Sequence, residues 1–432
     1  MKILHVIPSV SERSGGPGHA IVEMCRALQQ QGTEVLVATT DHGVTPVSSF
    51  EFRVSSLETA DVRSEFGQPA PIQDFESLTR NSELETRNCY KGVPTIFFPM
   101  QWGQSFKYSR PLAIWLDQNV KAFDVVHIHA VFNHACTAAA RACRKHGVPY
   151  VVRPLVTLHP WSMKQSPLRK RLFWYTVGKR MLRAAAAVHY TAPAEQQAVE
   201  QSLGLNHGTV IPLGIEADRF NQADAGKSFR QALPSLADHP YILVLSRLHP
   251  KKGLDVLVKA FLEVAAKTQF ANWRLVLAGE GPSDFVYSLR RLANHRGAKE
   301  LVLFPGWLEG QKKLSALSGA SLLALPSYQE NFGLCVMEAM ACGVPVLVSP
   351  HVSLASEIHA AGAGWVAPVK KDAMKKVLES ALGNAEERRC CARAGVEMAK
   401  AYRWPRAAAA LNELYSSLAL KRTSGSFHSS RS

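Results

Sequence analysis

The stretch KILHVIPSVSERSGGPGHAIVEMCRALQQQGTEVLVATT, residues 2–40, decides the fold class. Residues 2–7 form a continuous apolar run, which is typical of a parallel strand buried on both faces. A glycine-rich turn follows at 11–18, then a segment of helical periodicity that stops at Gly32, then the apolar run 34–40. Strand, turn, helix and strand in this order predict a parallel α/β sheet.

The same alternation of strands and helices continues along the chain, and after a linker a second series begins. Further strands are predicted at 123–130, 147–154 and 187–192, a basic helix at 162–187, loops and short elements at 42–95, and a linker at 209–220. A second series of strands is predicted at 241–248, 273–282, 300–307, 320–327 and 344–350, with helices between them. We therefore expect two α/β halves.

Composition agrees with two domains, since 432 residues with 47% hydrophobic side chains exceed one ordinary domain. The 50 Lys and Arg against 35 Asp and Glu give a net charge of +15, which suggests a nucleic acid, a phosphorylated small molecule or an acidic membrane as partner. Eight cysteines without a Cys-x-x-Cys pair indicate reduced, mostly buried thiols of a cytosolic protein rather than metal ligands. The first apolar run is too short for a signal peptide.

The glycine-rich turn fits the dinucleotide-binding fingerprint only halfway. Gly16 and Gly18 have the required spacing and Asp41 ends the second strand, but Ile21 occupies the third glycine position. Free N–H groups at a helix start suit a phosphate, and a tight turn without a ligand explains the glycines equally well.

The segment SRLHPKKGLD, residues 246–255, carries Arg247 after a strand and Lys252 before a helix. Two cations beside a helix N-terminus form a clamp for a diphosphate. An exposed basic loop is the alternative.

His127 and His129 alternate along the strand 123–130, so they point to the same side near its carboxyl end, where open α/β sheets bind ligands. A metal would need a third ligand, and none is evident. One histidine is explained by hydrogen bonding inside the core, and the other is a candidate for substrate contact.

The stretch PSYQENFGLCVMEAMACGVPVLVSP, residues 326–350, holds only two charged side chains, Glu330 and Glu338. Two helical residues eight apart lie ~12 Å apart along the axis, which is unsuitable for a glycosidase carboxylate pair. Gly333 indicates that Glu330 lies in a turn before a helix and Glu338 one or two turns inside it. The pair would then contact different parts of one extended ligand. A capping carboxylate plus an exposed helical glutamate is the alternative.

Residues 163–186 carry seven Lys and Arg side chains interleaved with Leu, Phe, Trp and Tyr. The pattern fits a helix on an anionic membrane surface, and it fits equally a solvated basic helix whose aromatic side chains pack inward.

The order of these motifs resembles glycosyltransferase family 4 closely. The resemblance rests on the glycine loop, DVVHIHA (124–130), PLGIEADRF (212–220), SRLHPKKG (246–253), LVLAGEGP (275–282), LVLFPGWL (301–308) and the Glu-x7-Glu segment before ACGVPVLVSP (341–350). It spans nearly the whole chain, and 247–357 is its most specific part. One departure is Leu213, where the family commonly has Asn in its linker. SGGPGHAIVEM and WGQSFKYS look like members that build bacterial exopolysaccharide or lipopolysaccharide.

The resemblance implies a GT-B fold: two Rossmann-like α/β domains whose parallel sheets face an interdomain cleft. It implies an acceptor-binding domain at 1–215 and a donor-binding domain at 216–401. A C-terminal helix at about 402–420 would pack back on the first domain. The polar segment 421–432 is expected to be a disordered tail.

The resemblance also implies site residues. The implied catalytic residues are Glu330, His129, Arg247 and Lys252. The implied donor-binding residues are Gly15, Gly16, Arg247, Lys252, Gly279, Leu308, Glu330, Asn331, Phe332, Gly333, Leu334 and Glu338. Arg247 and Lys252 would hold the pyrophosphate, and Glu330 would contact the sugar hydroxyls. The backbone of 331–334 would contact sugar and phosphate, and Glu338 would bind the ribose hydroxyls. The pocket for the nucleobase would be lined by Gly279 and residues 307–308. His129 would lie near the transferred sugar. The glycines Gly15 and Gly16 would approach the donor phosphates or the acceptor.

The implied function is a retaining hexosyltransferase of the EC 2.4 class, which uses a UDP-sugar or GDP-sugar and needs no cofactor or metal. Its acceptor would be a saccharide or a lipid-linked saccharide in the synthesis of bacterial exopolysaccharide, lipopolysaccharide or capsule. The expected location is cytoplasmic, with peripheral contact through 163–186 to the inner face of the plasma membrane.

Three alternatives remain at this point. One is a sugar-nucleotide epimerase of the same fold. Another is a basic nucleic-acid-binding protein, which only the charge supports, since no such binding motif is found. The last is a dinucleotide oxidoreductase, which Ile21 disfavours.

Overall fold

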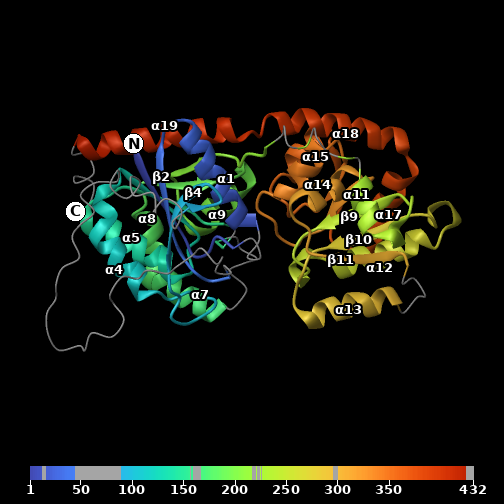
Figure 1. The fold of residues 1–432 in the computed structure, drawn as a ribbon, viewed down its shortest axis with the longest axis horizontal. Coiled ribbons are helices and arrows are strands. Elements are labelled where there is room, and N and C mark those ends of the chain that lie inside the picture. The colour runs from blue at the N-terminus through green and yellow to red at the C-terminus, as the bar shows by residue number, and fades with distance from the viewer. Residues whose placement is uncertain are drawn as a thin grey trace. The chain divides into compact units, whose positions relative to one another are not determined.

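The computed structural model describes residues 1–11, 16–43, 89–155, 157–158, 167–216, 220, 224, 226–294 and 300–424. Contacts divide the chain into two compact units. Unit 1 comprises Met1–Tyr190, Gln196–Ile211 and Ala407–Ser432, and unit 2 comprises Thr191–Glu195 and Pro212–Arg406. Figure 1 shows the elements of both. In the described ranges, no helix is both long and apolar enough to span a bilayer.

Unit 1 contains an eight-stranded sheet in the order β3-β4-β2-β1-β5-β6-β7-β8. The strands are β1 (Lys2–Ile7), β2 (Glu34–Thr40), β3 (Cys89–Tyr90), β4 (Val93–Phe98), β5 (Val125–His129), β6 (Tyr150–Arg153), β7 (Ala187–Tyr190) and β8 (Gly208–Val210). All pairs are parallel except β3 with β4. The sequence assigned 42–95 to loops and short elements, and β3 and β4 are two such short strands; β4 continues to Phe98 and pairs in parallel with β2. Residues 44–88 lie outside the described ranges.

The helices of unit 1 cover both faces of this sheet (Figure 1). They are α1 (Gly16–Gln30), α4 (Arg110–Asn119), α5 (His134–His146), α7 (Pro167–Phe173), a π-helical segment (Trp174–Gly178), α8 (Lys179–Arg183), α9 (Pro193–Leu203) and α19 (Trp404–Thr423). The first three residues of α9 and of α19 belong to unit 2. Leu4 and Val6 pack into one core with Leu112 and Leu116 of α4. Because side chains alternate along a strand, His5 points to the opposite face.

The C-terminal helix α19 belongs to unit 1 from Ala407 onward. Asn412 accepts a hydrogen bond from Thr33 (2.7 Å), and Arg422 donates to the carbonyl of Phe123 (2.9 Å). This second contact holds the end of the helix on unit 1, so the expectation of a tail from residue 421 was wrong for 421–423, which are helical. Residues 425–432 lie outside the described part of the chain.

Unit 2 contains a six-stranded parallel sheet in the order β11-β10-β9-β12-β13-β14. The strands are β9 (Tyr241–Leu245), β10 (Arg274–Ala278), β11 (Val302–Gly306), β12 (Leu322–Leu325), β13 (Val346–Val348) and β14 (Gly364–Val366). The helices are α11 (Lys227–Ala232), α12 (Leu254–Ala265), α13 (Ser283–Asn294), α14 (Gly310–Ser318), α15 (Leu334–Ala341), α16 (Ala355–Ala360), α17 (Lys371–Gly383) and α18 (Ala385–Lys400).

The strand order of unit 2 reverses between β9 and β12. From β9 the chain moves outward through β10 to β11, and then returns to the other side of β9 to form β12, β13 and β14. Each unit is thus an open, doubly wound α/β sheet, as the sequence predicted, and unit 1 has its own reversal between β1 and β5. In such sheets ligands bind beyond the carboxyl ends of the strands at the reversal point.

Candidate active site

The predicted cations and carboxylate of unit 2 come together at this reversal point. Arg247 and Lys252 follow β9, and Glu330 follows β12, the strand paired with β9. Lys252 forms an ion pair with Glu330, and both side chains are largely buried, at 13% and 20% exposed. The structure therefore joins two residues that lie far apart in the sequence at the edge of the sheet where a ligand is expected.

Backbone hydrogen bonds connect the two loops that carry this ion pair and connect the Glu330 loop to the loop after β13. Tyr328 donates its N–H to the carbonyl of Lys251 (2.8 Å), and Glu330 donates its N–H to the carbonyl of His351 (3.0 Å). Gly253, at φ +63°, lies so close to the β12 loop that a Cβ would be 2.3 Å from the Pro326 carbonyl oxygen. A glycine is therefore required where the two loops meet.

We expect Gly253→Ala to destabilise unit 2 by about 2–4 kcal/mol, because it combines a strained left-handed backbone with a backbone clash. Gly362→Ala is the matched control, since Gly362 has φ +64° and a Cβ added there would meet no other atom within 4 Å. The control substitution should lower the free energy of unfolding only by the backbone strain, about 1 kcal/mol. Urea unfolding of both variants measures the difference, and equal losses would contradict the packing argument.

Glu330 is held ionised by its surroundings. Burial by itself raises the pKa of this carboxyl, but the Lys252 ammonium and its hydrogen bond oppose that effect and keep the pKa below its ordinary value. The pair therefore presents one fixed positive and one fixed negative group. A ligand with a phosphate and hydroxyl groups could contact both.

The helix α15 begins as the sequence predicted. Gly333, at φ +72°, is its N-cap, so Glu330 lies in the turn before the helix and Glu338 within it. Phe332 is buried and packs against Tyr402, and Leu334 is half-buried. The Asn331 amide nitrogen, when turned toward Glu195, lies 2.8 Å from that carboxylate. The side chains of Asn331 and Phe332 are therefore engaged within unit 2, and the predicted contact of the 331–334 backbone with sugar and phosphate stays a prediction.

Glu338 has a partner that the sequence did not reveal. Lys313 of α14 donates a hydrogen bond to its Oε1 (2.7 Å) and lies 2.6 Å from its Oε2. Both carboxylate oxygens of Glu338 therefore contact the Lys313 ammonium, so this buried carboxylate is paired.

Arg247 and the predicted base pocket lie at the same edge of the sheet. Arg247 is exposed, and its guanidinium makes no hydrogen bond or ion pair with another of the described residues, whereas its carbonyl accepts a hydrogen bond from the Ser246 hydroxyl (3.2 Å). Gly279, directly after β10, has φ +147°, and a Cβ there would be 1.9 Å from the Ser246 carbonyl oxygen. Leu308, after β11, is half-buried. The chain after β10 thus packs directly on the β9 loop, and the predicted base pocket beside Gly279 and Leu308 stays a prediction.

The predicted glycines of unit 1 are described only in part. Gly15 lies outside the described residues, whereas Gly16 is the exposed first residue of α1. Gly18 is buried, and a Cβ there would be 2.6 Å from the Val10 carbonyl oxygen. The helix begins three residues earlier than its apolar pattern indicated, because the glycines let its first turn pack against the preceding loop.

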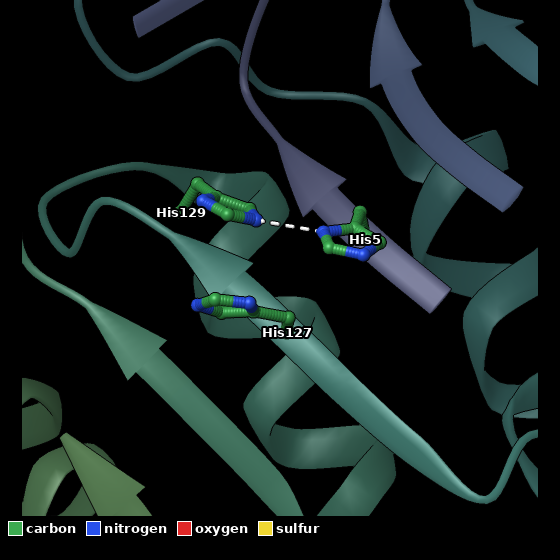
Figure 2. A group of neighbouring side chains, drawn as sticks. All are labelled: His5, His127 and His129. Atoms are coloured by element: carbon green, nitrogen blue, oxygen red, sulfur yellow. Dashed lines mark hydrogen bonds between the residues drawn. The ribbon is translucent and has the colours of Figure 1, made fainter. Parts of the chain in front are cut away.

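Figure 2 shows three imidazole rings gathered on one face of unit 1, from His5 on β1 and from His127 and His129 on β5. His5 is paired in register with His127, and all three are fully buried. His5 Nδ1 lies 3.0 Å from His129 Nε2. Sequence reasoning missed His5 because it belongs to a continuous apolar run, and only strand pairing brings it beside the other two.

A hydrogen-bonded chain fixes the protonation of this cluster. His189 Nε2 must donate to the carbonyl of Ile211 (2.7 Å), so a neutral His189 accepts at Nδ1 from His127 Nε2 (3.3 Å). His127 then accepts at Nδ1 from the hydroxyl of Tyr415 on α19 (2.6 Å). Burial, and then the charge of Arg153, lower the pKa of His5 and of His189 to about 3. The cluster is therefore neutral.

The ring nitrogens of the cluster lie close enough together, within 4.8 Å, to ligate one metal ion. Two observations favour hydrogen bonding instead. Both nitrogens of His127 are already used, and the buried Arg153, paired in register with His129, would repel a second positive charge. We therefore interpret the cluster as a polar part of the core. The predicted contact of His129 with the transferred sugar stays a prediction.

Comparison with known proteins agrees with this fold. The family model for glycosyl transferases group 1 matches residues 227–398, and the glycosyl transferase 4-like domain matches 15–214. A GDP-mannose-dependent α-(1-6)-phosphatidylinositol monomannoside mannosyltransferase of Mycolicibacterium smegmatis is 30% identical over 37% of this chain and 41% of its own length. A D-inositol 3-phosphate glycosyltransferase of Nocardia farcinica is 28% identical over 56% of this chain and 54% of its own. The chain thus spans about half or less of these relatives.

Solved structures of known proteins have the same fold. HepE of Anabaena, in complex with UDP and glucose, superimposes with a TM-score of 0.71 at 20% identity and covers 96% of this chain and 100% of its own. WaaG, a glycosyltransferase involved in lipopolysaccharide biosynthesis, gives 0.67 at 17% identity, over 95% of this chain and 99% of its own. At these identities the likeness concerns the fold, which is that of the GT-B class.

The two family matches together cover most of the chain. The protein belongs to glycosyltransferase family 4.

Proposed function

We propose that the protein is a retaining glycosyltransferase that moves a hexosyl group from a nucleoside-diphosphate sugar to a saccharide acceptor. The observation that carries the proposal is the Lys252–Glu330 ion pair at the reversal point of unit 2, beside the exposed Arg247. Two cations at a helix start can bind a diphosphate, and a fixed carboxylate can accept hydrogen bonds from sugar hydroxyls. UDP-sugars and GDP-sugars are the donors to test first.

The proposed reaction uses the cations at the leaving group. The bond between the anomeric carbon and the diphosphate oxygen breaks, and Lys252 with Arg247 stabilises the charge that develops there. The acceptor hydroxyl bonds to the anomeric carbon on the same face, and its proton passes to a phosphate oxygen of the leaving diphosphate. Glu330 positions the sugar, and Glu338 binds the ribose. No cofactor or divalent ion is needed in this proposal, so EDTA should leave turnover unchanged.

A donor and acceptor panel tests the transfer. UDP-, GDP- and ADP-sugars are incubated with mixed glycan acceptors, and glycosylated product is measured by mass spectrometry. We expect product with one donor class and retention of the anomeric configuration. A folded protein that neither transfers nor hydrolyses any donor would contradict the proposal.

A sugar-nucleotide epimerase of the same fold remains the second candidate, because its donor site would use the same two cations. It would release nucleotide without an acceptor. Omission of the acceptor separates the two candidates, since only the transferase should then stop.

We also propose that the acceptor is lipid-linked, made for a bacterial exopolysaccharide, lipopolysaccharide or capsule, and reached from the cytoplasmic face of the membrane. The support is the helix α7 and the π-helical segment after it. Leu168, Leu172 and Tyr175 are 81%, 68% and 68% exposed at helical spacing, next to Lys170 and Arg171. Trp174 instead is buried, so the aromatic residues divide between the core and the surface. An exposed apolar stripe with cations beside it suits an anionic bilayer.

We expect Leu172→Asp to lower binding to vesicles of phosphatidylglycerol and phosphatidylethanolamine ~10-fold, because it places a charge in the apolar stripe. Leu420→Asp is the matched control, since Leu420 is also 68% exposed but lies on α19. Cosedimentation measures both. Unchanged binding of the Leu172 variant would contradict membrane contact through α7.

A further inference from the structure

Trp102 is an exposed aromatic side chain that the proposed chemistry does not use. Among the described residues it is the one tryptophan that is more than half exposed, at 58%. It lies in the aromatic loop, which we define as residues 101–109 between β4 and α4. Burial of an indole stabilises a folded protein, and an exposed indole does not contribute this stabilisation. An exposed tryptophan is therefore a candidate for ligand contact.

The aromatic loop holds Trp102 in a fixed place. The indole stacks on the ring of Tyr108, with centroids 4.9 Å apart and planes at 20°. The backbones of these two residues pair as an antiparallel bridge, in which Tyr108 donates its N–H to the Trp102 carbonyl (3.1 Å). Lys107 is in the left-handed region, at φ +53°. A strained residue that keeps a tight turn is typical of functional loops.

Contacts to other elements place the loop at the carboxyl edge of the unit 1 sheet. His134, the first residue of α5 after β5, donates its N–H to the carbonyl of Phe106 (2.8 Å), and its ring packs 4.4 Å from that of Tyr108. Met100, just before the loop, donates its N–H to Asp41, which follows β2 (2.9 Å). The loop thus spans the ends of β4, β2 and β5, beside the reversal between β1 and β5 where this unit is expected to bind a ligand.

We propose that Trp102 is the floor of a subsite for one pyranose ring of the acceptor saccharide. A pyranose has an apolar face of C–H groups, which suits the exposed part of a rigid indole, and a rim of hydroxyls that need polar partners. Lys107 of the aromatic loop and His42, which follows Asp41, interact electrostatically with each other, and both side chains are only partly buried. An apolar surface with a few polar groups at its rim is the usual composition of a small-ligand site.

This inference rests on the proposed function, because a transferase needs an acceptor site in addition to the donor site. The implied donor-binding residues from Arg247 to Glu338 belong to unit 2, whereas the aromatic loop, like Gly15 and Gly16, belongs to unit 1. A nucleobase or a lipid tail could also contact an indole. Acceptor and donor kinetics distinguish both ligands from a pyranose ring.

Binding is tested with the full-length protein by saturation-transfer NMR. The probes are methyl glycosides of glucose, mannose, galactose and N-acetylglucosamine. We expect at least one to bind, and the signals of its ring C–H protons to fall about tenfold in Trp102→Ala and to stay within twofold in Trp102→Phe. Tyr287→Ala is the matched control, an equally exposed aromatic residue (67%) on α13 of unit 2. Wild-type signals in the alanine variant, or no binding of any glycoside by the wild type, would overturn the proposal.

Kinetics separate this subsite from the proposed function itself. Trp102→Ala should raise the acceptor KM about tenfold while the donor KM and the melting temperature stay unchanged. An unchanged acceptor KM in a protein that still transfers sugar would overturn the subsite and leave the proposed function intact. A raised donor KM would assign Trp102 to the nucleotide, and recovery of the defect with vesicles would assign it to lipid; both overturn the subsite. Absence of nucleotide-sugar binding in the wild type would instead contradict the proposed function.

Discussion

Replacement of Lys252 by alanine should lower kcat at least ~10³-fold with any donor that the protein accepts. The substitution removes a cation at the leaving diphosphate, and a single charge-stabilising donor in an active site contributes on the order of 10²–10³ in rate. It also leaves the largely buried carboxylate of Glu330 without its ion-pair partner. Both effects act on the same site, so the loss should exceed that from one lost contact. Steady-state assays with saturating donor measure it.

Lys259→Ala is the control for this prediction. Lys259 is half-exposed on α12, where it lies 3.8 Å from Asp255 and away from the strand ends. It should retain wild-type turnover. Glu330→Ala should be as inactive as the Lys252 variant. Wild-type rates in either site variant would remove this ion pair from the active site.

Acid should unfold unit 1 steeply, because its buried histidines are neutral. In the unfolded chain a histidine takes up a proton near pH 6.5, whereas burial holds the pKa of His5 and His189 at about 3 and lowers those of His127 and His129 well below their ordinary value. The unfolded state therefore binds more protons below pH 6.5. The contribution of these neutral histidines to the free energy of unfolding is fully present above pH 6.5 and is lost as the pH falls toward 3. Each histidine contributes ~1.4 kcal/mol per pH unit, so the four together give roughly 5 kcal/mol per pH unit.

Hydrogen exchange followed by mass spectrometry between pH 7.5 and 4.5 checks this result for each unit separately, after correction for the pH dependence of intrinsic exchange. Peptides of β1, β5 and β7 should lose protection as the pH falls, earlier than peptides of unit 2. His5→Asn should reduce the slope by about a quarter, and His359→Gln, which replaces an exposed histidine of α16, should leave it unchanged. Constant protection of unit 1 down to pH 4.5 would contradict the neutral cluster.

The sequence predicted the elements whose signal is local. Buried parallel strands such as β1 and β9 stand out as apolar runs, and Gly333 marked the start of α15. The strand β4 was predicted only as an unspecified short element, because Pro94 interrupts its apolar run. Its residues 95–98 nevertheless pair with β2, and Pro94 lies opposite Cys89 of the short strand β3.

Long-range contacts could not be predicted in the same way. Lys313 contacts Glu338 from another helix, 25 positions away, and no local pattern links them. The last turn of α19 depends on a carbonyl 299 positions away, at Phe123, so a polar segment whose composition indicated disorder is partly helical. His5 joined the cluster only through the register of β1 with β5.

The hydrogen-bonded chain from Tyr415 to Ile211 has a consequence for biosynthesis. His127 and His189 are translated early, but the hydroxyl that satisfies His127 belongs to a helix that follows the whole of unit 2. While the ribosome is still making residues 212–406, unit 1 has a buried imidazole acceptor with no donor and lacks the helix that supplies it. Unit 2 is contiguous apart from five residues, so it can finish first. The first half of this protein to be translated is therefore the last to reach its native state.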